Sequence, residues 1–189
     1  MTIKEKLITK IVESELEMFQ SVPADRNYNC QQDPAGFRLH RQAQFTIWSE
    51  DALRSYRNDL DQAEEDGVNL MTIKYGRMQN IIPGENLNPL IDKIIAVQLE
   101  WQAEMMRQYP NLMAGARRLA QSEDSEDAVS FETYLRGELE TYSDATLALL
   151  HRDVLDYAQA GVNGSEKIYD HLVKEMGFDS LTAADRAQT

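Results

Sequence analysis

The sequence predicts an all-α protein: a helical bundle of about six to eight helices, built from two three-helix repeats related by a pseudo-two-fold axis. Patterns typical of strands are nearly absent, and apolar residues recur at three- and four-residue spacing along most of the chain. Residues 37–75 also align without a gap on residues 131–169, at a shift of 94 positions. Such internal repetition constrains the architecture before local helix propensity does.

The alignment of the two repeats contains eight identities. They are Phe37/Phe131, Ser49/Ser143, Leu53/Leu147, Asp59/Asp153, Gly67/Gly161, Val68/Val162, Asn69/Asn163 and Tyr75/Tyr169. At a shift of 83, Ile11, Glu15, Leu16 and Glu17 fall on Ile94, Gln98, Leu99 and Glu100. We therefore interpret residues 1–189 as a single domain with internal repeats 1–84 and 85–178. Residues 179–189 are expected to form a flexible tail.

The first helix of each repeat is bounded by proline. A helix over residues 2–22 carries an apolar stripe and stops at Pro23. Its counterpart follows the Pro83–Gly84 turn, starts near Leu87 and ends at Tyr109–Pro110. Both helices therefore have defined ends in the sequence.

The second and third helices of each repeat are marked by capping residues and by glycine stops. Asp33 caps the second helix, which is expected to bend near Ser49 and to end at Gly67, a residue suited to a left-handed C-terminal stop. Asn69 then caps a short third helix. The corresponding signals in the second repeat are Ser130, Gly161, Asn163 and Gly177.

Composition excludes several classes of protein. The formal charge of −13 disfavours binding to nucleic acid and to anionic membranes, because both depend on Lys and Arg. No apolar run approaches the roughly 20 residues that span a bilayer, and the N-terminus lacks secretory features. One cysteine excludes an internal disulfide framework. The single cysteine and the N-terminus favour a cytoplasmic protein. Glycine-rich phosphate and dinucleotide motifs are absent, so we expect no cofactor.

Acidic and amide side chains interrupt the apolar stripes at matching positions. The first repeat places Glu15 on its first helix and Gln44 on its second. The second repeat exchanges the two types, with Gln98 on its first helix and Glu138 on its second. Since an amide N–H can donate to a carboxylate, Glu15–Gln44 and Gln98–Glu138 are candidate pairs between helices. These pairs could simply fix the register of the helices.

The two repeats differ at the position of Arg41, and this difference indicates a candidate catalytic or binding role. Arg41 could neutralise Glu15 or bind an anionic ligand through its planar guanidinium. The matching residue of the second repeat is Leu135, so Glu138 has no cation on its own stripe. A buried carboxyl group with only an amide partner would have a raised pKa, as a general acid or base requires. Glu138 and Glu15 are therefore candidate catalytic residues.

Cysteine, aromatic and histidine side chains are further candidates for a site. Cys30 precedes the second helix, where a nearby helix N-terminus could favour a thiolate nucleophile, although a lone cysteine is also commonly a small buried residue. Trp48, Trp101 and Tyr142 form the core or line a cavity for a flat ligand. No histidine motif typical of a metal site occurs, and a cation held by the Glu and Gln side chains is a weak alternative, so we predict no metal.

The chain resembles a bacterial family of uncharacterised all-helical proteins. The resemblance rests on Cys30-Gln31, on Phe37 with Arg41, Gln44 and Trp48, and on the run from Phe131 to Leu139, Phe-Glu-Thr-Tyr-Leu-Arg-Gly-Glu-Leu. It includes Lys74-Tyr75 and Tyr142-Ser143 and covers most of the chain. It implies a bacterial cytosolic protein, and it implies no activity.

Two functions follow from these residues. In the first, a small molecule binds where the repeats meet, in a site lined by Glu15, Arg41, Gln44, Gln98 and Glu138, with Trp48, Trp101 and Tyr142 as walls. A cofactor-independent isomerase, lyase or cyclase would then use Glu138 to move a proton and Arg41 to orient an anionic group. In the second, the protein is a non-catalytic adaptor or self-associating protein whose polar pairs are structural. Repeated helical halves also leave surface for a homodimer.

Overall fold

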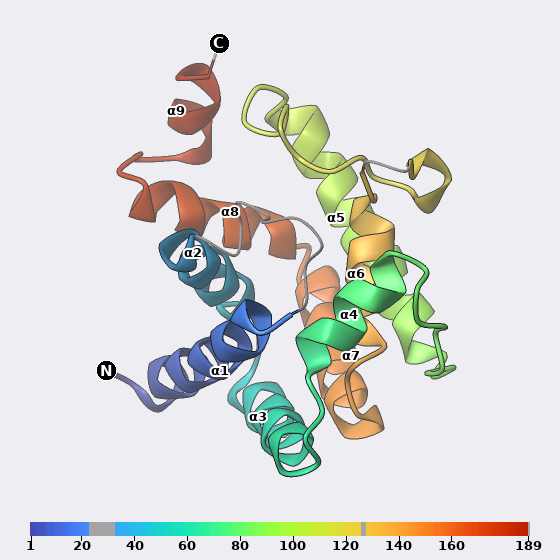
Figure 1. The fold of residues 1–189 in the computed structure, drawn as a ribbon. Coiled ribbons are helices and arrows are strands. Elements are labelled where there is room, and N and C mark those ends of the chain that lie inside the picture. The colour runs from blue at the N-terminus through green and yellow to red at the C-terminus, as the bar shows by residue number, and fades with distance from the viewer. Residues whose placement is uncertain (23–32, 126–127, 189) are drawn as a thin grey trace.

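The structure is a computed structural model that describes residues 1–22, 33–125 and 128–188, and over these residues the chain is all-helical without strands (Figure 1). The predicted fold class is confirmed. Nine α-helices and one short 3₁₀ helix, η2, are present in the described residues. They are α1 (Ile3–Gln20), α2 (Pro34–Phe45), α3 (Glu50–Glu65), α4 (Leu70–Met78), α5 (Leu90–Gln108), η2 (Gln121–Glu123), α6 (Phe131–Leu139), α7 (Asp144–Gln159), α8 (Gly164–Glu175) and α9 (Leu181–Arg186).

Each long second helix expected from the sequence is in fact two helices. The chain breaks before Ser49, whose hydroxyl accepts a hydrogen bond from the amide of Ala52 at the start of α3 (3.2 Å). In the second half, Ser143 caps α7 through the amide of Thr146 in the same way (3.2 Å). Serine at an N-cap satisfies an amide that would otherwise lack a partner, so it starts a new helix. The expectation of three helices in each half is therefore wrong, because α1–α4 and α5–α8 each comprise four.

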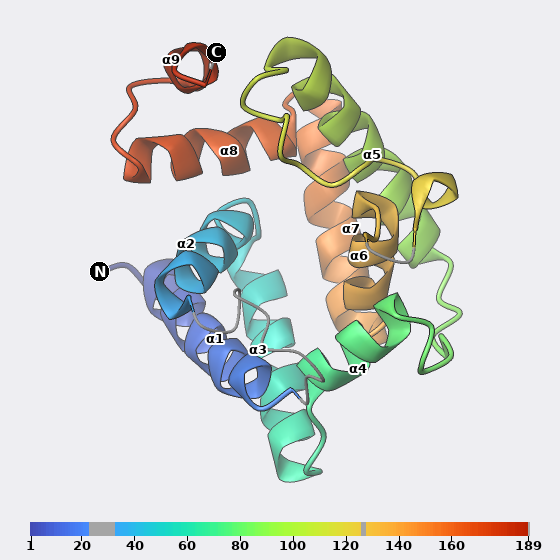
Figure 2. The same ribbon diagram turned by 45° about the horizontal axis from the view of Figure 1, so that its top comes forward.

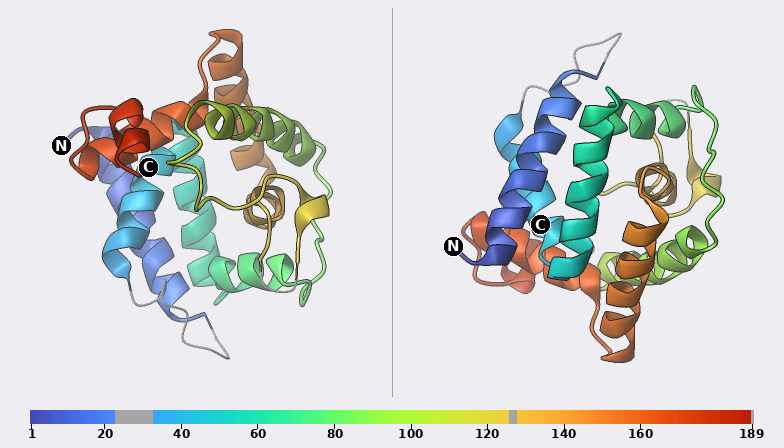
Figure 3. Two further views of the ribbon diagram at one scale, coloured as in Figure 1. Left: turned by 90° about the horizontal axis from the view of Figure 1, so that it is seen from above. Right: turned by 90° about the horizontal axis from the view of Figure 1, so that it is seen from below.

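The last helix of each half packs against both halves. α4 packs against α1 of its own half and against α6 of the second, and α8 packs against α5 of its own half and against α2 of the first (Figures 2 and 3). α3 and α7 also pack against each other between the halves. This arrangement places side chains of α1, α2, α4 and α6 next to one another, which a helix order read along the chain does not suggest.

Reciprocal hydrogen bonds join the halves at matched positions. The Asp153 carboxylate on α7 accepts from the backbone N–H of Ser49 (2.8 Å), and the Asp59 carboxylate on α3 accepts from the backbone N–H of Ser143 (3.1 Å). The pairs Asp59/Asp153 and Ser49/Ser143 are both identities of the sequence alignment. A two-fold arrangement of two copies would produce such a pair of contacts. The tandem duplication itself stays a prediction.

A second matched contact anchors α4 and α8 to the first helix of their own half. The Asn69 side-chain amide donates to the carbonyl oxygen of Met18 on α1 (2.8 Å), and the Asn163 amide donates to that of Trp101 on α5 (3.0 Å). Both asparagines also cap the helix that follows them. The preceding Gly67 and Gly161 each have φ of 67°, a conformation that glycine adopts without strain.

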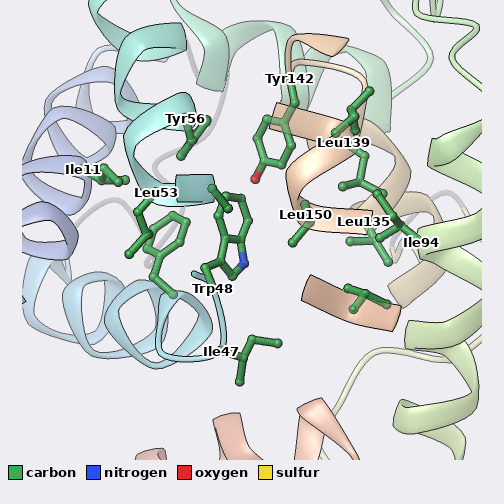
Figure 4. Close-up of a cluster of buried hydrophobic side chains, with 14 of the residues drawn as sticks. Ile11, Ile47, Trp48, Leu53, Tyr56, Ile94, Leu135, Leu139, Tyr142 and Leu150 are labelled. Atoms are coloured by element: carbon green, nitrogen blue, oxygen red, sulfur yellow. The ribbon is translucent and has the colours of Figure 1, made fainter. Parts of the chain in front are cut away.

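The main core lies along the contact between the halves. Figure 4 shows Trp48 and Tyr56 of the first half facing Tyr142 and Leu150 of the second. The ring centroids of Tyr56 and Tyr142 are 4.7 Å apart, and those of Trp48 and Tyr142 are 5.7 Å apart in an edge-to-face arrangement. Trp48 and Tyr142 are therefore core residues, and a single apolar cluster spans both halves.

The C-terminal segment departs from the sequence-based expectation of a flexible tail. Residues 181–186 form α9, in which Leu181 and Ala184 are buried against a smaller cluster that contains Met105 and Val173. The Asp185 carboxylate also accepts hydrogen bonds from two backbone amides that follow α5. A short amphipathic helix can bury little apolar surface alone, so its order depends on this contact with the second half.

None of the helices in the described residues is both long and apolar enough to span a lipid bilayer.

We expect the two reciprocal hydrogen bonds, from Ser49 to Asp153 and from Ser143 to Asp59, to contribute similar amounts to the free energy of unfolding. Asp153→Ala should lower the free energy of unfolding by about 1–3 kcal/mol, because the N–H of Ser49 would lose its partner in a partly buried position. Asp59→Ala should cost at least as much, since Asp59 also accepts from the Thr146 hydroxyl. Urea denaturation of both variants would measure this, with the exposed Asp156→Ala as the matched control. A loss no larger than that of the control would contradict the proposed role of these caps.

Candidate functional site

Four charged side chains are buried together where the halves meet. Glu15 comes from α1, Arg41 from α2, Lys74 from α4 and Glu138 from α6; they are 0%, 4%, 2% and 2% exposed. We call these four residues the charge cluster. Its two carboxylates balance its two cations. Burial of an unpaired charge costs several kcal/mol, so the pairing of these groups is what allows them to lie in the core.

Arg41 is the central residue of the charge cluster. Its guanidinium donates two hydrogen bonds to the Glu15 carboxylate, from Nε to Oε2 (2.7 Å) and from Nη2 to Oε1 (2.5 Å). Its remaining terminal nitrogen donates to Glu138 Oε1 (3.0 Å) and to Gln44 Oε1 (2.5 Å). The planar guanidinium suits this arrangement, because it can bind one carboxylate in a bidentate manner and still reach a second.

Lys74 completes the pairing of Glu138 from across the interface between the halves. Its Nζ donates to Glu138 Oε2 (2.7 Å) and lies 3.9 Å from the ring centroid of Tyr134. The adjacent Gly137 permits this close approach of α6 to α4, because a Cβ atom there would lie 2.9 Å from Met78 and 3.2 Å from the Lys74 carbonyl oxygen. A larger residue at position 137 would therefore separate Lys74 from Glu138.

Two tyrosines and one glutamine supply the remaining hydrogen bonds. The Tyr56 hydroxyl donates to Glu15 Oε1 (2.7 Å), and the Tyr142 hydroxyl donates to Glu138 Oε1 (2.6 Å). The Gln44 amide also donates to Glu138 Oε1 (3.3 Å). Glu138 thus accepts from Arg41, Lys74, Gln44 and Tyr142, and its negative charge is fully compensated.

These contacts set the ionisation of the cluster. Burial alone would raise the pKa of Glu138, but the positive charges of Arg41 and Lys74 and the hydrogen bonds outweigh it, so this pKa lies well below its usual range. Burial would lower the pKa of Lys74, but the combined attraction of Glu138, Tyr134 and Tyr75 outweighs it, so this pKa is raised. Burial and the neighbouring carboxylates raise the pKa of Tyr142 well above its ordinary value. None of these three groups changes its charge near neutral pH.

Two predictions about the carboxylates are therefore wrong. The raised pKa expected for Glu138 does not occur, because Lys74 reaches it from a helix of the other half. The expected Glu15–Gln44 and Gln98–Glu138 pairs do not form. Glu15 binds Arg41 and Tyr56 instead, since a charged bidentate donor is stronger than an amide. The proposed neutralisation of Glu15 by Arg41 is confirmed.

A small cavity adjoins the charge cluster on the side of the second half. Its lining includes five of the predicted site residues, namely Gln44, Trp48, Gln98, Glu138 and Tyr142. Its volume is about 10 Å³, which is enough for about one water molecule. The structure thus brings these predicted residues together without room for a drug-sized ligand, which needs roughly 300–1,000 Å³.

The remaining two predicted site residues have different outcomes. Trp101 lies away from the charge cluster, where its ring packs against Gly164 at the start of α8 and 6.4 Å from the ring centroid of Tyr157. Cys30 falls outside the described residues. In the parts of the chain that the structure describes, no group of three or more His, Cys, Asp or Glu side chains is placed to hold a metal ion.

Trp101 lines a larger, open groove on the second half. This α5–α8 groove has a volume of about 620 Å³ and lies against α5, the end of α7 and the start of α8. Its lining is Val97, Glu100, Trp101, Ala103, Glu104, Arg107, Ala158, Gly161, Val162, Asn163 and Glu166. Sequence reasoning missed this groove, because its walls come from helices that are distant in the chain.

Sequence reasoning also missed Lys74 and Tyr56 as members of the site. A signal for Lys74 was available, because the repeat alignment pairs Lys74 with Ile168 and so places a charge at an apolar core position. Gly137 next to Glu138 was a second signal, since a glycine inside a helix permits close packing. Tyr56 matches Leu150 in the same alignment and adds a hydroxyl to the core.

The fold and site define a class: an all-helical protein with two interlocked halves and a fully paired charge cluster between them. Residues 5–186 match the family described as Protein of unknown function (DUF4125), and the chain belongs to this family. This membership confirms the resemblance to an uncharacterised family. Neither a curated protein nor a solved structure matches the chain.

Removal of one charge from the cluster should destabilise the protein strongly. We expect Glu138→Gln to lower the free energy of unfolding by about 3–5 kcal/mol, because Lys74 would stay buried without a counterion. For a chain of this size that loss corresponds to a fall in Tm of roughly 6–20 °C. Glu13→Gln is the matched control, since Glu13 pairs with Arg38 in an exposed position and should lose under about 1 kcal/mol. Equal losses in the two variants would refute the structural role of Glu138.

The lowered pKa of Glu138 also predicts how stability depends on pH. In the unfolded chain a glutamate binds a proton near pH 4.3, whereas folded Glu138 does so only at lower pH. Below about pH 4.3 the unfolded state therefore holds more protons, and acid favours unfolding. The difference in unfolding free energy between wild type and Glu138→Gln should be greatest above about pH 5. It should shrink as the pH falls below the pKa of the glutamate in the unfolded chain, about 4.3. Urea denaturation at several pH values measures it, and a difference that grows in acid would contradict this prediction.

Proposed function

We propose that this protein is a non-catalytic small-molecule-binding protein, in which the charge cluster is a structural joint and the α5–α8 groove is the ligand site. One observation carries the proposal: the cluster pairs its two carboxylates with its two cations beside a cavity of about 10 Å³, whereas the groove is open and about 620 Å³ in volume. The ligand then binds away from the contact between the repeats, and the polar residues at that contact are structural.

The ionisation of the cluster supports a structural role over acid–base chemistry. A general acid or base works best with a pKa near the operating pH. Glu138 stays a carboxylate and Lys74 stays an ammonium ion at neutral pH, because each stabilises the charge of the other. A nucleophilic lysine would need a lowered pKa, which is the opposite shift. The catalytic role predicted for Glu138 therefore lacks the electrostatic environment that it requires.

The size and lining of the α5–α8 groove support ligand binding there. Its volume falls in the range of roughly 300–1,000 Å³ that is typical of small-molecule sites. Its wall combines apolar side chains, such as Val97 and Val162, with the polar groups of Glu104 and Asn163. Such a mixture provides apolar contact area together with a few groups that orient a ligand.

The proposal can be tested by altering each site separately. In Lys74→Ile/Glu138→Gln both charges of one pair are removed, and the new residues are those that the second half and first half carry at the matching positions 168 and 44. Ala158→Trp fills the groove from an exposed position of α7. A small-molecule library screened by thermal shift should give hits that the double variant keeps and that Ala158→Trp loses. Hits lost only in the double variant, with the fold verified by circular dichroism, would place the ligand at the cluster and overturn the proposal.

A further inference from the structure

The charges along the α5–α8 groove are predominantly negative. Its lining contains three carboxylates, Glu100, Glu104 and Glu166, and one cation, Arg107. Glu104 accepts hydrogen bonds from Asn163 (3.0 Å) and from Gln108 (2.9 Å). Among the described residues, neither Glu100 nor Glu166 has an ion-pair partner. Both residues are exposed, and we call their side chains the uncompensated carboxylates because no described cation pairs with them.

The contact between Asn163 and α5, which borders the groove, does not require the groove carboxylates. In the first half, Asn69 makes the same hydrogen bond to α1 that Asn163 makes to α5. The second bond of the Asn69 amide goes to the Ser21 hydroxyl, where that of Asn163 goes to Glu104. A neutral hydroxyl therefore serves this joint equally well, and the repeat alignment likewise pairs Glu166 with Thr72. At Glu104 and Glu166 the second half therefore carries acids where packing alone does not require them, whereas Glu100 matches Glu17 of the first half at a shift of 83.

The apolar part of the groove indicates what else a ligand must offer. Val97, Ala103 and Val162 line it together with Trp101, a residue that is 7% exposed. These side chains suit a hydrocarbon chain, and the carboxylates suit positive charges attached to it. Burial and the negative charges of Glu166 and Asp170 also raise the pKa of Tyr109, at the C-terminal end of α5. A negative potential thus extends along this part of the second half.

We infer that the α5–α8 groove binds a small organic cation with an alkyl chain, of the class of alkyl diamines and polyamines, between the carboxylates of Glu100, Glu104 and Glu166. This inference names the ligand class of the proposed function and rests on it. The ammonium groups would pair with the uncompensated carboxylates, and the methylene groups would contact the apolar wall. Arg107 would oppose a cation, so its removal should favour binding.

Isothermal titration calorimetry with spermidine and with hexane-1,6-diamine tests the inference. Both should bind the wild-type protein, and Glu100→Gln/Glu166→Gln should weaken binding by about tenfold, because two opposite charges are lost from the site. Arg107→Gln should strengthen it. The matched control is Glu64→Gln/Glu65→Gln, which makes the same change in total charge at exposed positions of α3 and should alter the affinity less than about twofold.

Four results would overturn the inference. Equal weakening in both double variants would mean that the cations respond only to the total charge of −13. Equally tight binding of hexane-1,6-diol would mean that the groove selects alkyl chains without regard to charge. Binding of a lysine-rich peptide without binding of either amine would identify a surface for a protein partner. If neutral or anionic library compounds bind in a manner that Ala158→Trp abolishes, the ligand class is wrong while the proposed function stands.

Discussion

The bridging of two buried carboxylates by Arg41 is the interaction on which the structure depends. A buried guanidinium is tolerable only when its donors are matched by acceptors of opposite charge, and Glu15 and Glu138 supply them from different halves. Lys74 then balances the second carboxylate. Because each ion is compensated by partners on other helices, α1, α2, α4 and α6 must adopt one relative arrangement. Displacement of any one of them would leave a charge unpaired in the core.

The hydrogen bonds around the charge cluster occur at matching positions of both halves, whereas the charged residues of the cluster do not. The backbone N–H groups of Ser49 and Ser143 donate matching hydrogen bonds to Asp153 and Asp59, so both halves share one scheme of helix joints. At the positions that match Arg41 and Lys74, the second half carries Leu135 and Ile168. Glu138 alone of the four charged residues comes from the second half, and the small cavity lies beside it, lined also by Leu135 and Ile168. The open α5–α8 groove also lies on the second half.

The sequence indicated much of the frame and part of the site. Capping residues such as Asn163 and the left-handed Gly161 act over a few residues, so local patterns predict where helices begin and end. The identities of the repeat alignment also selected Asp59 and Asp153 before their contacts were known. Lys74 was missed as a partner of Glu138 because 64 residues separate the two, and a raised pKa was predicted from the apparent absence of a cation. Short-range patterns do not show that α4 packs against α6 of the other half.

The sequence by itself determined that the chain is helical, where most helices end, and which polar residues interrupt apolar stripes. These properties follow from hydrophobic periodicity and capping, both of which are local. The tertiary structure alone decided that α4 and α8 each pack against both halves, that residues 181–186 form α9 against a smaller apolar cluster, and that Lys74 neutralises Glu138. The physical reason is that a pKa and a cavity both depend on which side chains surround a group in space, and distant segments supply those neighbours.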